Sequence, residues 1–545
     1  MESYDYIVIG AGPAGTTLSS LLSRREPTLK VLLIEAGPDP RTTELADSVA
    51  APMRVGLLRG SELDWNYEGA PQKHLKGRQI YVGAGKGLGG GTIINYGLWT
   101  RGDSKDYDEW ARLVGDDRWS WKGFLPYFCK TEHHYDPADS SNIHGHDGPV
   151  YTASIRSSGR NYVLREPLKK AWGEVGIKEA GDVNAGSPLG LAECVEARTA
   201  GQRVTAPAAY PLDRMTVLHS TLVKKVLISK KEDGTKLATG VELSDGRQIS
   251  AKREVVISAG SIRTPQILML SGIGPEEELE RHGIEQLVDS PEVGKNHWDH
   301  VGLTQCWKLQ NPEIGAAIGS PKWTDPAFST GNPLDWYTTS SVPQDELLAA
   351  LSQDKHAAST GDDALVASPR CHLGLIVQYF GIPLDGSLIT SYALNLMPTS
   401  RGTVTLSSTD PAANPIIDHN IYATEADRFR IRSGARLFAK MMSTPAGKEM
   451  VVGEAVPEGQ KAISENSSDD EIDARFFEGA NSIGHSSGTA AMGKVVDTKL
   501  KVKGIQGLRV VDASILPTPL TAPIQACMYA LGEQAADIVL EDLQE

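Results

Sequence analysis

The stretch YIVIGAGPAG, residues 6–15, decides the fold, because a run of four apolar residues leads directly into a complete G-x-G-x-x-G. Residues 6–9 are short, apolar and rich in branched side chains, which predicts a buried strand. Residues 17–22 have helical character, and residues 30–35 predict a second strand. Strand, glycine turn, helix and strand together predict the β-α-β unit that binds a dinucleotide.

Each glycine of this motif has a separate task. Gly10 permits the tight turn, Gly12 lets the backbone approach a pyrophosphate, and Gly15 lets the helix pack closely on the strand. The helix that follows directs free N–H groups and the positive end of its dipole at the phosphates. Glu35 ends the second strand, where its carboxylate can accept hydrogen bonds from ribose hydroxyls and disfavours a 2′-phosphate. These residues alone leave FAD or NAD as the dinucleotide.

Length and composition are those of a soluble protein with more than one domain. The chain has 545 residues, of which 40% are hydrophobic and 23% charged, so two domains are expected. A net charge of −15 argues against nucleic acid and acidic membrane surfaces as partners, and no run is long enough to span a bilayer. The first strand starts within ten residues, which leaves no room for a signal peptide and favours an intracellular (cytoplasmic) protein. A mature chain whose signal had been removed would look the same.

A second glycine-rich segment, residues 83–95, has six glycines in its first nine residues. Ordering so many glycines is entropically costly, so such a segment is kept where backbone must lie against a large, flat group. A flexible linker is the alternative, but an apolar stretch follows at once, which is not typical of linkers. We therefore interpret this segment as a cofactor-facing loop.

Periodicity and composition predict the remaining elements. Strands are predicted within 216–228, 239–243, 253–260, 371–407 and 507–514, and helical regions at 106–129, 261–275, 424–442 and 526–540. The arginines of the helix at 424–442 fall on its polar positions and predict a solvated face; they are Arg428, Arg430, Arg432 and Arg436. Residues 311–369 are rich in Pro, Gly, Ser, Thr and Asp, which predicts a structureless lid or access loop, or a mobile insertion. The interspersed aromatic residues favour a lid over a plain linker.

Histidine and cysteine spacing gives no metal site. The pairs His133-His134 and His144-x-His146 lie in loop-like sequence without helical spacing or cysteine partners, so we expect exposed histidines. The five cysteines are scattered, which predicts buried or free thiols in a reducing compartment. No bound metal is expected.

Together these motifs resemble the glucose–methanol–choline (GMC) family of flavoprotein oxidoreductases nearly end to end. The N-terminal glycine motif with Glu35 resembles the FAD site of the family, and residues 85–95 with Arg101-Gly102 resemble its first signature. Residues 260–275 are similar to its second signature, and residues 294–300 match a further family segment. The resemblance implies FAD contacts at Gly85, Gly90, Thr92, Asn95, Val223 (adenine), and Asp512 and Ala513 (pyrophosphate and ribityl chain).

The same resemblance implies an α/β fold. A Rossmann-like FAD-binding domain is joined to a substrate domain built on an antiparallel sheet flanked by helices, which forms a roof over the flavin. We expect an FAD-binding domain of residues 1–150, 206–310 and 481–545 and a substrate-binding domain of residues 151–205 and 311–480. Some family members tether the flavin through a histidine at the position of Ile94, so we predict non-covalent FAD here. The expected partner is a small-molecule substrate, and the expected state is a monomer or homodimer.

The family oxidises alcohols by removing the hydroxyl proton while hydride passes from carbon to flavin N5, so a base must lie within reach of the hydroxyl. His485, in the segment 484–493, matches the catalytic histidine of the family, and a histidine pKa suits this role. The second family residue, a His or Asn, falls at Pro523, which has no side-chain donor or acceptor and no backbone N–H. Gln525 lies close in sequence and is predicted to supply an amide instead.

Three functions compete because of this departure. The prediction is FAD-dependent oxidation of an alcohol, a bulky secondary metabolite, with His485 as base; losing one aimed hydrogen bond costs on the order of a few kcal/mol and need not stop turnover. The alternative is a non-redox enzyme that keeps FAD structurally, such as a cyclase, dehydratase or lyase. A binding-only role is disfavoured because His485 and every FAD motif are present.

Overall fold

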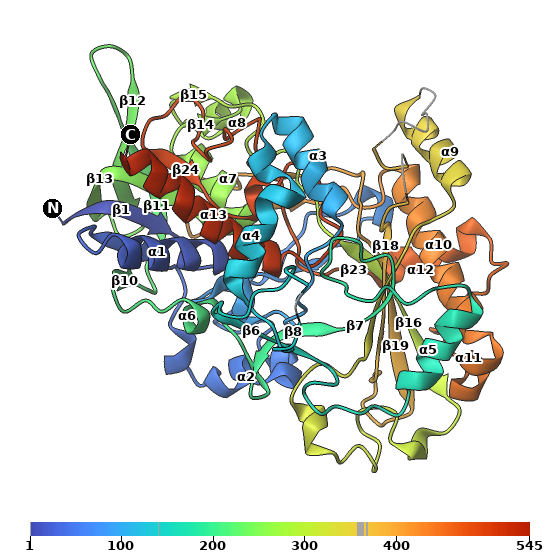
Figure 1. Cartoon of the computed structure of the whole chain (residues 1–545). Helices are drawn as coiled ribbons and strands as arrows, with labels where there is room; N and C mark the ends of the chain where they lie inside the picture. The colour runs from blue at the N-terminus through green and yellow to red at the C-terminus, as the bar shows by residue number, and fades with distance from the viewer. Residues whose placement is uncertain (1, 140, 357–363, 367–368, 545) are drawn as a thin grey trace.

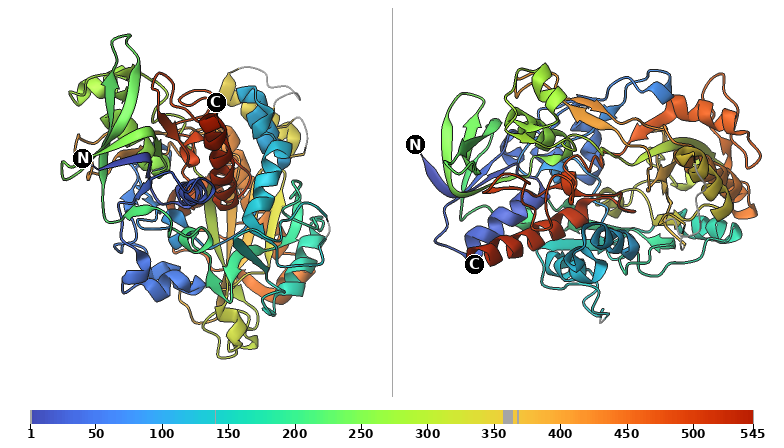
Figure 2. Two further views of the ribbon diagram at one scale, coloured as in Figure 1. Left: turned by 60° about the vertical axis from the view of Figure 1, so that its left-hand side comes forward. Right: turned by 90° about the horizontal axis from the view of Figure 1, so that it is seen from above.

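Two seven-stranded sheets organise the chain, each with its own hydrophobic core. The computed structural model describes residues 2–139, 141–356, 364–366 and 369–544. In Figure 1 the first sheet lies on the side of both termini, and the second sheet lies beside α5, α10, α11 and α12. Figure 2 shows these two groups at opposite ends of the molecule. The predicted α/β fold is confirmed.

The first sheet is built around the predicted β-α-β unit. Its strand order is β10 (Thr216–Leu218), β2 (Val31–Ile34), β1 (Ser3–Ile9), β13 (Gln248–Ile257), β12 (Lys236–Leu243) and β11 (Val223–Lys230), with β24 (Leu508–Val510) paired to β13. The pairs β10–β2, β2–β1, β1–β13 and β13–β24 are parallel, whereas β11, β12 and β13 form an antiparallel meander. The central parallel segments, residues 6–9, 31–34, 255–257 and 508–510, are buried, as their near-continuous Val, Ile and Leu predict, whereas β10 at the edge is partly exposed.

Glycine fixes how the first strand meets its helix, α1 (Pro13–Arg25). Gly10 has φ +101°, a backbone conformation that suits glycine. A Cβ on Gly15 would lie 2.2 Å from the carbonyl oxygen of Gly10 and 2.8 Å from Cβ of Ser258. The close approach of helix and strand that the motif predicts is therefore present. The closing helix α13 (Gln525–Gln544) packs along α1 (Figure 1).

The second sheet is antiparallel and places one face toward helices. Its order is β22 (Val451–Glu454), β16 (Val301–Leu309), β19 (Leu388–Asn395), β18 (Leu373–Gln378), β17 (Trp336–Ser340) and β7 (Gly190–Glu193), with β23 (Ala480–Ser482) paired to β16. Helix α10 (Glu425–Met442) packs on β19, and a Cβ on Gly434 would lie 2.9 Å from that of Ala393. With α10 are grouped α5 (Arg165–Glu174), α11 (Pro445–Met450) and α12 (Asp469–Gly479).

Strand β16 changes one predicted boundary. Residues 301–309, which we had expected in the FAD-binding part, pair with β19, β22 and β23 of the second sheet. No strand was predicted at these residues, and apolar alternation would in any case be the same in either sheet. The remaining division into domains stays a prediction.

The predicted structureless lid is wrong in part, because regular elements interrupt it. Residues 336–340 form β17 and residues 344–355 form the helix α9 (Gln344–Lys355), while residues 357–363 and 367–368 lie outside the described residues. Trp323 packs on Tyr162 and Phe328, with ring centroids 5.3 and 4.6 Å apart. These aromatic side chains belong to the second core and are not a free cover.

The helix predictions hold, but one predicted solvated face does not. The aromatic region at 106–129 becomes α3 (Ser104–Val114) and α4 (Trp121–Thr131), with Tyr107 packed among four other rings. On α10, Arg430 is fully buried, and Arg432 pairs with Asp473 of α12 at 2.6 Å. Arg432 is buried where α12 packs on α10 and supplies the carboxylate, whereas Arg430 pairs with Asp427 of its own helix at 3.3 Å.

Over the residues described, none of the helices combines the length and the apolar character needed to cross a bilayer.

Candidate active site

A cavity of about 1160 Å³ lies between the two sheets. All but one of the residues predicted to contact the cofactor line it: Gly10, Gly12, Glu35, Gly85, Gly90, Thr92, Asn95, Val223, Asp512 and Ala513. The exception is Gly15, which packs inside the β1–α1 unit. Pro523, Gln525 and His485 line the same cavity. Residues from five separate segments are thus brought to one site.

The two glycine-rich segments lie against each other at one end of this cavity. A Cβ on Gly90 would lie 2.7 Å from Cα of Gly12, so the second loop presses directly on the first. A Cβ on Gly12 itself would meet no atom within 4 Å, because that position faces open space. Bare backbone thus faces the cavity where a pyrophosphate could approach.

Carboxylates hold the loops at this end. Glu35 accepts hydrogen bonds from the N–H groups of Ala11 (2.9 Å) and Gly37 (2.8 Å), and burial raises its pKa to about 7. Asp512 accepts from the N–H of Gly260 (2.9 Å) and the hydroxyl of Thr264 (2.6 Å), and burial raises its pKa as well. Both groups line the cavity while they fix the backbone around it.

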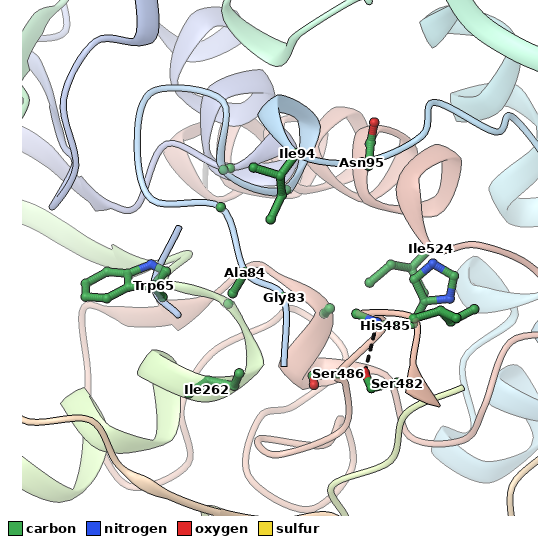
Figure 3. Close-up of a pocket in the computed structure, with 18 of the residues that line it drawn as sticks. Trp65, Gly83, Ala84, Ile94, Asn95, Ile262, Ser482, His485, Ser486 and Ile524 are labelled. Atoms are coloured by element: carbon green, nitrogen blue, oxygen red, sulfur yellow. Dashed lines mark hydrogen bonds between the residues drawn. The ribbon is translucent and has the colours of Figure 1, made fainter. Parts of the chain in front are cut away.

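The residues at this end fit FAD. The N-terminal residues of α1 and of α7 (Gly260–Leu270) line the cavity, where helix N–H groups favour phosphate. Ser258 and Ser261 also line it, and their buried hydroxyls have no hydrogen-bond partner in the described part of the chain. Ile94 projects into the cavity at the position where some family members carry a tethering histidine (Figure 3). An isoleucine side chain offers no nucleophile for a covalent bond to flavin.

His485 lines the cavity from a loop that follows β23 (Figure 3). Its Nδ1 lies 2.9 Å from Nδ1 of His300, and among the described residues this is the hydrogen-bond contact of its ring. Burial, with a smaller contribution from His300, holds the pKa of His485 well below its usual value. The ring is therefore neutral at neutral pH, as a general base must be.

Asp299 anchors the loop that carries His485. Its carboxylate accepts hydrogen bonds from the backbone N–H of His485 (2.8 Å) and the hydroxyls of Ser482 (2.6 Å) and Ser486 (3.3 Å). Burial raises the pKa of Asp299 to about 6. The sequence showed Asp299 and His300 only as part of a family segment, because their partners lie more than 180 residues further along the chain.

A chain of amides reaches the cavity from another side. Arg203 donates from Nη1 to Oδ1 of Asn95 (3.0 Å), and Nδ2 of Asn95 donates to Oε1 of Gln525 (2.7 Å). A guanidinium only donates, so these contacts fix the orientation of both amides. In the described chain the hydrogen bond of the Gln525 side chain is made by its Oε1, which leaves Nε2 as a donor. Arg203 had not been identified from the sequence.

The second sheet supplies a wall of the cavity without formal charge. Nine residues of its strands line the cavity; they are Gly302, Thr304, Tyr337, Ile376, Gln378, Tyr392, Leu394, Asn481 and Ser482. The charged residues that line the cavity, His485 aside, come from other segments; among the described residues they are Glu35, Arg59, Asp64, Arg78, Arg263 and Asp512. This wall can therefore accept apolar surface and a few neutral polar groups.

The histidine cluster outside the cavity differs from the prediction, because His134 and His144 are buried. His144 Nδ1 lies 2.7 Å from Glu132, whose carboxylate also accepts from Arg101 (2.6 Å) and from the indole N–H of Trp99 (2.9 Å). Burial opposes protonation of His144, but hydrogen bonds to Asp182 and Glu132 outweigh it and raise the pKa to about 9. Both oxygens of Glu132 are occupied by donors, so the cluster is a buried ion-pair network. The spacing of the histidines could not show that they lie beside Glu132, the carboxylate that pairs with the guanidinium of Arg101.

Comparison with known proteins adds independent findings. Models of the GMC oxidoreductase family match residues 4–302 and 398–532. The chain is 40% identical to the GMC-type oxidoreductase acuG of Aspergillus aculeatus, over 99% of each chain. It is 32% identical to an alcohol dehydrogenase [acceptor] of Pseudomonas putida, over 98% of this chain and 96% of the other. Among solved structures, a formate oxidase variant of Aspergillus oryzae RIB40 in which FAD modification was examined superposes with a TM-score of 0.86, at 27% identity, covering 100% of this chain and 99% of that one.

Proposed function

Because this chain belongs to the GMC oxidoreductase family and is an FAD-dependent oxidoreductase, we propose that it oxidises an uncharged, bulky alcohol of secondary metabolism with His485 as the base. One observation carries this proposal: His485 turns a ring nitrogen without a protein partner toward the cavity that the two glycine loops line. A substrate hydroxyl beside that nitrogen would find an acceptor for its proton.

The residues that would hold FAD are the cavity-lining glycines with Glu35, Thr92, Asn95, Val223, Asp512 and Ala513. With Ile94 at the position of the tethering histidine, we take the binding to be non-covalent. When bound, FAD supplies the acceptor for the hydride that leaves the alcohol carbon.

The side chains near His485 divide the remaining work. His485 accepts the hydroxyl proton on Nε2, and the amide Nε2 of Gln525 donates a hydrogen bond to the substrate oxygen as negative charge develops there. Asp299 holds the backbone of His485 and so keeps the ring in place. The low pKa of His485 keeps its ring unprotonated until the substrate proton arrives.

The substrate class is argued from the wall of the second sheet. Tyr337, Ile376, Tyr392 and Leu394 offer apolar and aromatic surface, and Thr304 and Gln378 offer neutral hydrogen-bonding groups. A charged substrate would lose hydration there without gaining an opposite charge from this wall. A bulky, neutral alcohol therefore fits better than a small cation or anion.

Pro523 is the observation that favours a second function. It lines the cavity where the family carries a second His or Asn, and it offers no hydrogen bond from its side chain. An enzyme that uses His485 for proton transfer alone, as a cyclase, dehydratase or lyase with structural FAD, is compatible with this loss. Gln525, which already presents a donor, makes oxidation the better supported reading.

Anaerobic mixing separates the two functions. We expect neutral aromatic or polycyclic alcohols to bleach the flavin absorbance, whereas choline and formate, which carry a charge, leave it unchanged. A compound that is converted while the flavin stays oxidised would refute the redox proposal and support the second function. Bleaching by choline or formate in preference to neutral alcohols would refute the substrate class.

A further inference from the structure

His300 lies behind His485 and has no contact with the cavity. It is fully buried, immediately before β16, and does not line the cavity that His485 lines. Two contacts of its ring have hydrogen-bond geometry: Nε2 lies 3.0 Å from the backbone carbonyl oxygen of Leu396, and Nδ1 lies 2.9 Å from Nδ1 of His485. The backbone of Leu520 is also near the ring and, like Leu396, acts to raise the pKa of His300 against the larger effect of burial. The two rings meet nearly at right angles, with an interplanar angle of 83°.

The carbonyl of Leu396 decides which nitrogen of His300 carries the proton. A carbonyl oxygen only accepts, so Nε2 of His300 must be the donor in that contact. In a neutral ring Nδ1 of His300 then has a lone pair and accepts. The proton between the two Nδ1 atoms therefore belongs to His485, and Nε2 of His485 keeps its lone pair.

The other protonation states are less favourable. With the proton on Nδ1 of His300, two lone pairs would face each other at 3.0 Å between His300 Nε2 and the carbonyl oxygen of Leu396. With protons on both nitrogens, His300 would be a buried cation, and burial holds its pKa at about 4. One arrangement satisfies both contacts without a buried charge.

We propose that His300 is a positioning residue that fixes the tautomer of His485, so that the nitrogen facing the cavity is the one able to accept a proton. The proposal rests on the proposed role of His485 as a base. When His485 takes the hydroxyl proton on Nε2, its Nδ1–H continues to donate to His300, so the hydrogen bond survives the transfer. His300 thus orients the base as a triad carboxylate does, but without adding negative charge beside it.

The ring nitrogens can be assigned directly in the FAD-loaded enzyme. With ¹⁵N-labelled histidine, long-range ¹H–¹⁵N spectra distinguish a nitrogen that carries a proton from one that does not, and His485→Gln and His300→Asn identify the two rings. We expect His485 protonated on Nδ1 only and His300 protonated on Nε2 only. A resting His485 with its proton on Nε2 overturns the proposal.

Two matched variants test the consequence for catalysis. In His300→Leu the acceptor is lost and His485 can adopt either tautomer, so the rate constant of flavin reduction should fall about 10²-fold with KM little changed; a wrong tautomer costs a serine protease triad about 10⁴-fold. In His300→Asn an amide oxygen can occupy the place of Nδ1 and accept, so the rate should stay within about tenfold of the unmodified enzyme. Equal rates in the two variants, at equal flavin content, overturn the proposal.

These measurements fail separately from the proposed function. If no alcohol reduces the flavin, the proposed oxidation is refuted while the ring-nitrogen assignment still decides the role of His300. If the assignment is reversed in an enzyme that oxidises alcohols, only the role of His300 is refuted.

Discussion

Two hydrogen-bonded chains reach the cavity from different sides, and they end with opposite character. The chain from His300 to His485 consists of neutral rings and ends in a lone pair. The chain from Arg203 through Asn95 to Gln525 begins at a guanidinium and ends in an amide N–H. An alcohol oxygen between them could give its proton to the first chain and accept a hydrogen bond from the second.

The difference shows that, in each chain, the group furthest from the cavity decides whether the residue nearest the cavity donates or accepts a hydrogen bond there. The carbonyl of Leu396 only accepts, which makes His300 an acceptor toward His485; the guanidinium of Arg203 only donates, which makes Gln525 a donor toward the cavity. Neither terminal residue could be assigned this way alone, because histidine and glutamine can each donate or accept.

The largest effect is expected at the end of the first chain. His485→Ala should keep FAD and fold but lower the rate constant of flavin reduction about 10²–10⁴-fold, the usual contribution of a general base. Stopped-flow mixing with the best alcohol substrate measures it. A near-normal rate of flavin reduction in this variant would show that His485 is not the base. The amide of Gln525 would then have no proton acceptor opposite it.

The pH dependence of the rate constant of flavin reduction is a second test of His485 as the base. A base acts when unprotonated, and the pKa of His485 lies well below its usual value because the ring is buried. Flavin reduction should therefore not lose rate with a pKa near 6.5 as pH falls. Asp299, whose pKa burial raises to about 6, faces the backbone of His485, so loss of rate near pH 6 would indicate protonation of this anchor. The variant Asp299→Asn should then remove that step from the profile.

A smaller effect is expected at the end of the second chain. Gln525→Leu removes the donor, and the rate constant of flavin reduction should fall about 10²-fold, the lower range for one lost oxyanion-type donor. Gln525→Glu is the matched control, because its carboxylate can still accept from Asn95 but offers only lone pairs to the cavity. Both variants should lose rate alike; a rate in Gln525→Glu close to that of the unmodified enzyme would show that shape alone is required there.

The two ends of the cavity differ in how far the sequence could predict them. The β1–α1–β2 unit and Glu35 lie within one short segment, and the spacing of Gly10, Gly12 and Gly15 implies their positions. The end of the cavity beside His485 joins residues far apart: 185 positions separate His300 from His485, and 430 separate Asn95 from Gln525. A single sequence contains no signal for such pairs, so Gln525 was predicted only by its proximity to Pro523.

The same reason explains the predictions that were wrong. His134, His144, Arg430 and Arg432 were read as exposed because polar residues in loops and on helices usually are, yet each is buried beside carboxylates or under a neighbouring helix. Residues 301–309 were assigned to the FAD-binding part, although they pair in the second sheet, because a single sequence does not show which sheet a segment joins. Local sequence patterns predicted the helices and strands, whereas contacts between residues far apart in the sequence decided which side chains are buried and which strands pair.

The smallest effect is expected where the chain departs from its family. If Gln525 already supplies the donor, adding an amide through Pro523→Asn should change the rate constant of flavin reduction by less than about tenfold. The measurement should be made with and without Gln525→Leu. In the Leu background the new amide should restore part of the lost rate, because it then supplies the only donor from that segment. A large increase in this rate constant from Pro523→Asn alone would mean that the amide of Gln525 does not reach the substrate oxygen. His485, held by His300, would then accept the substrate proton without a hydrogen-bond donor on the opposite side.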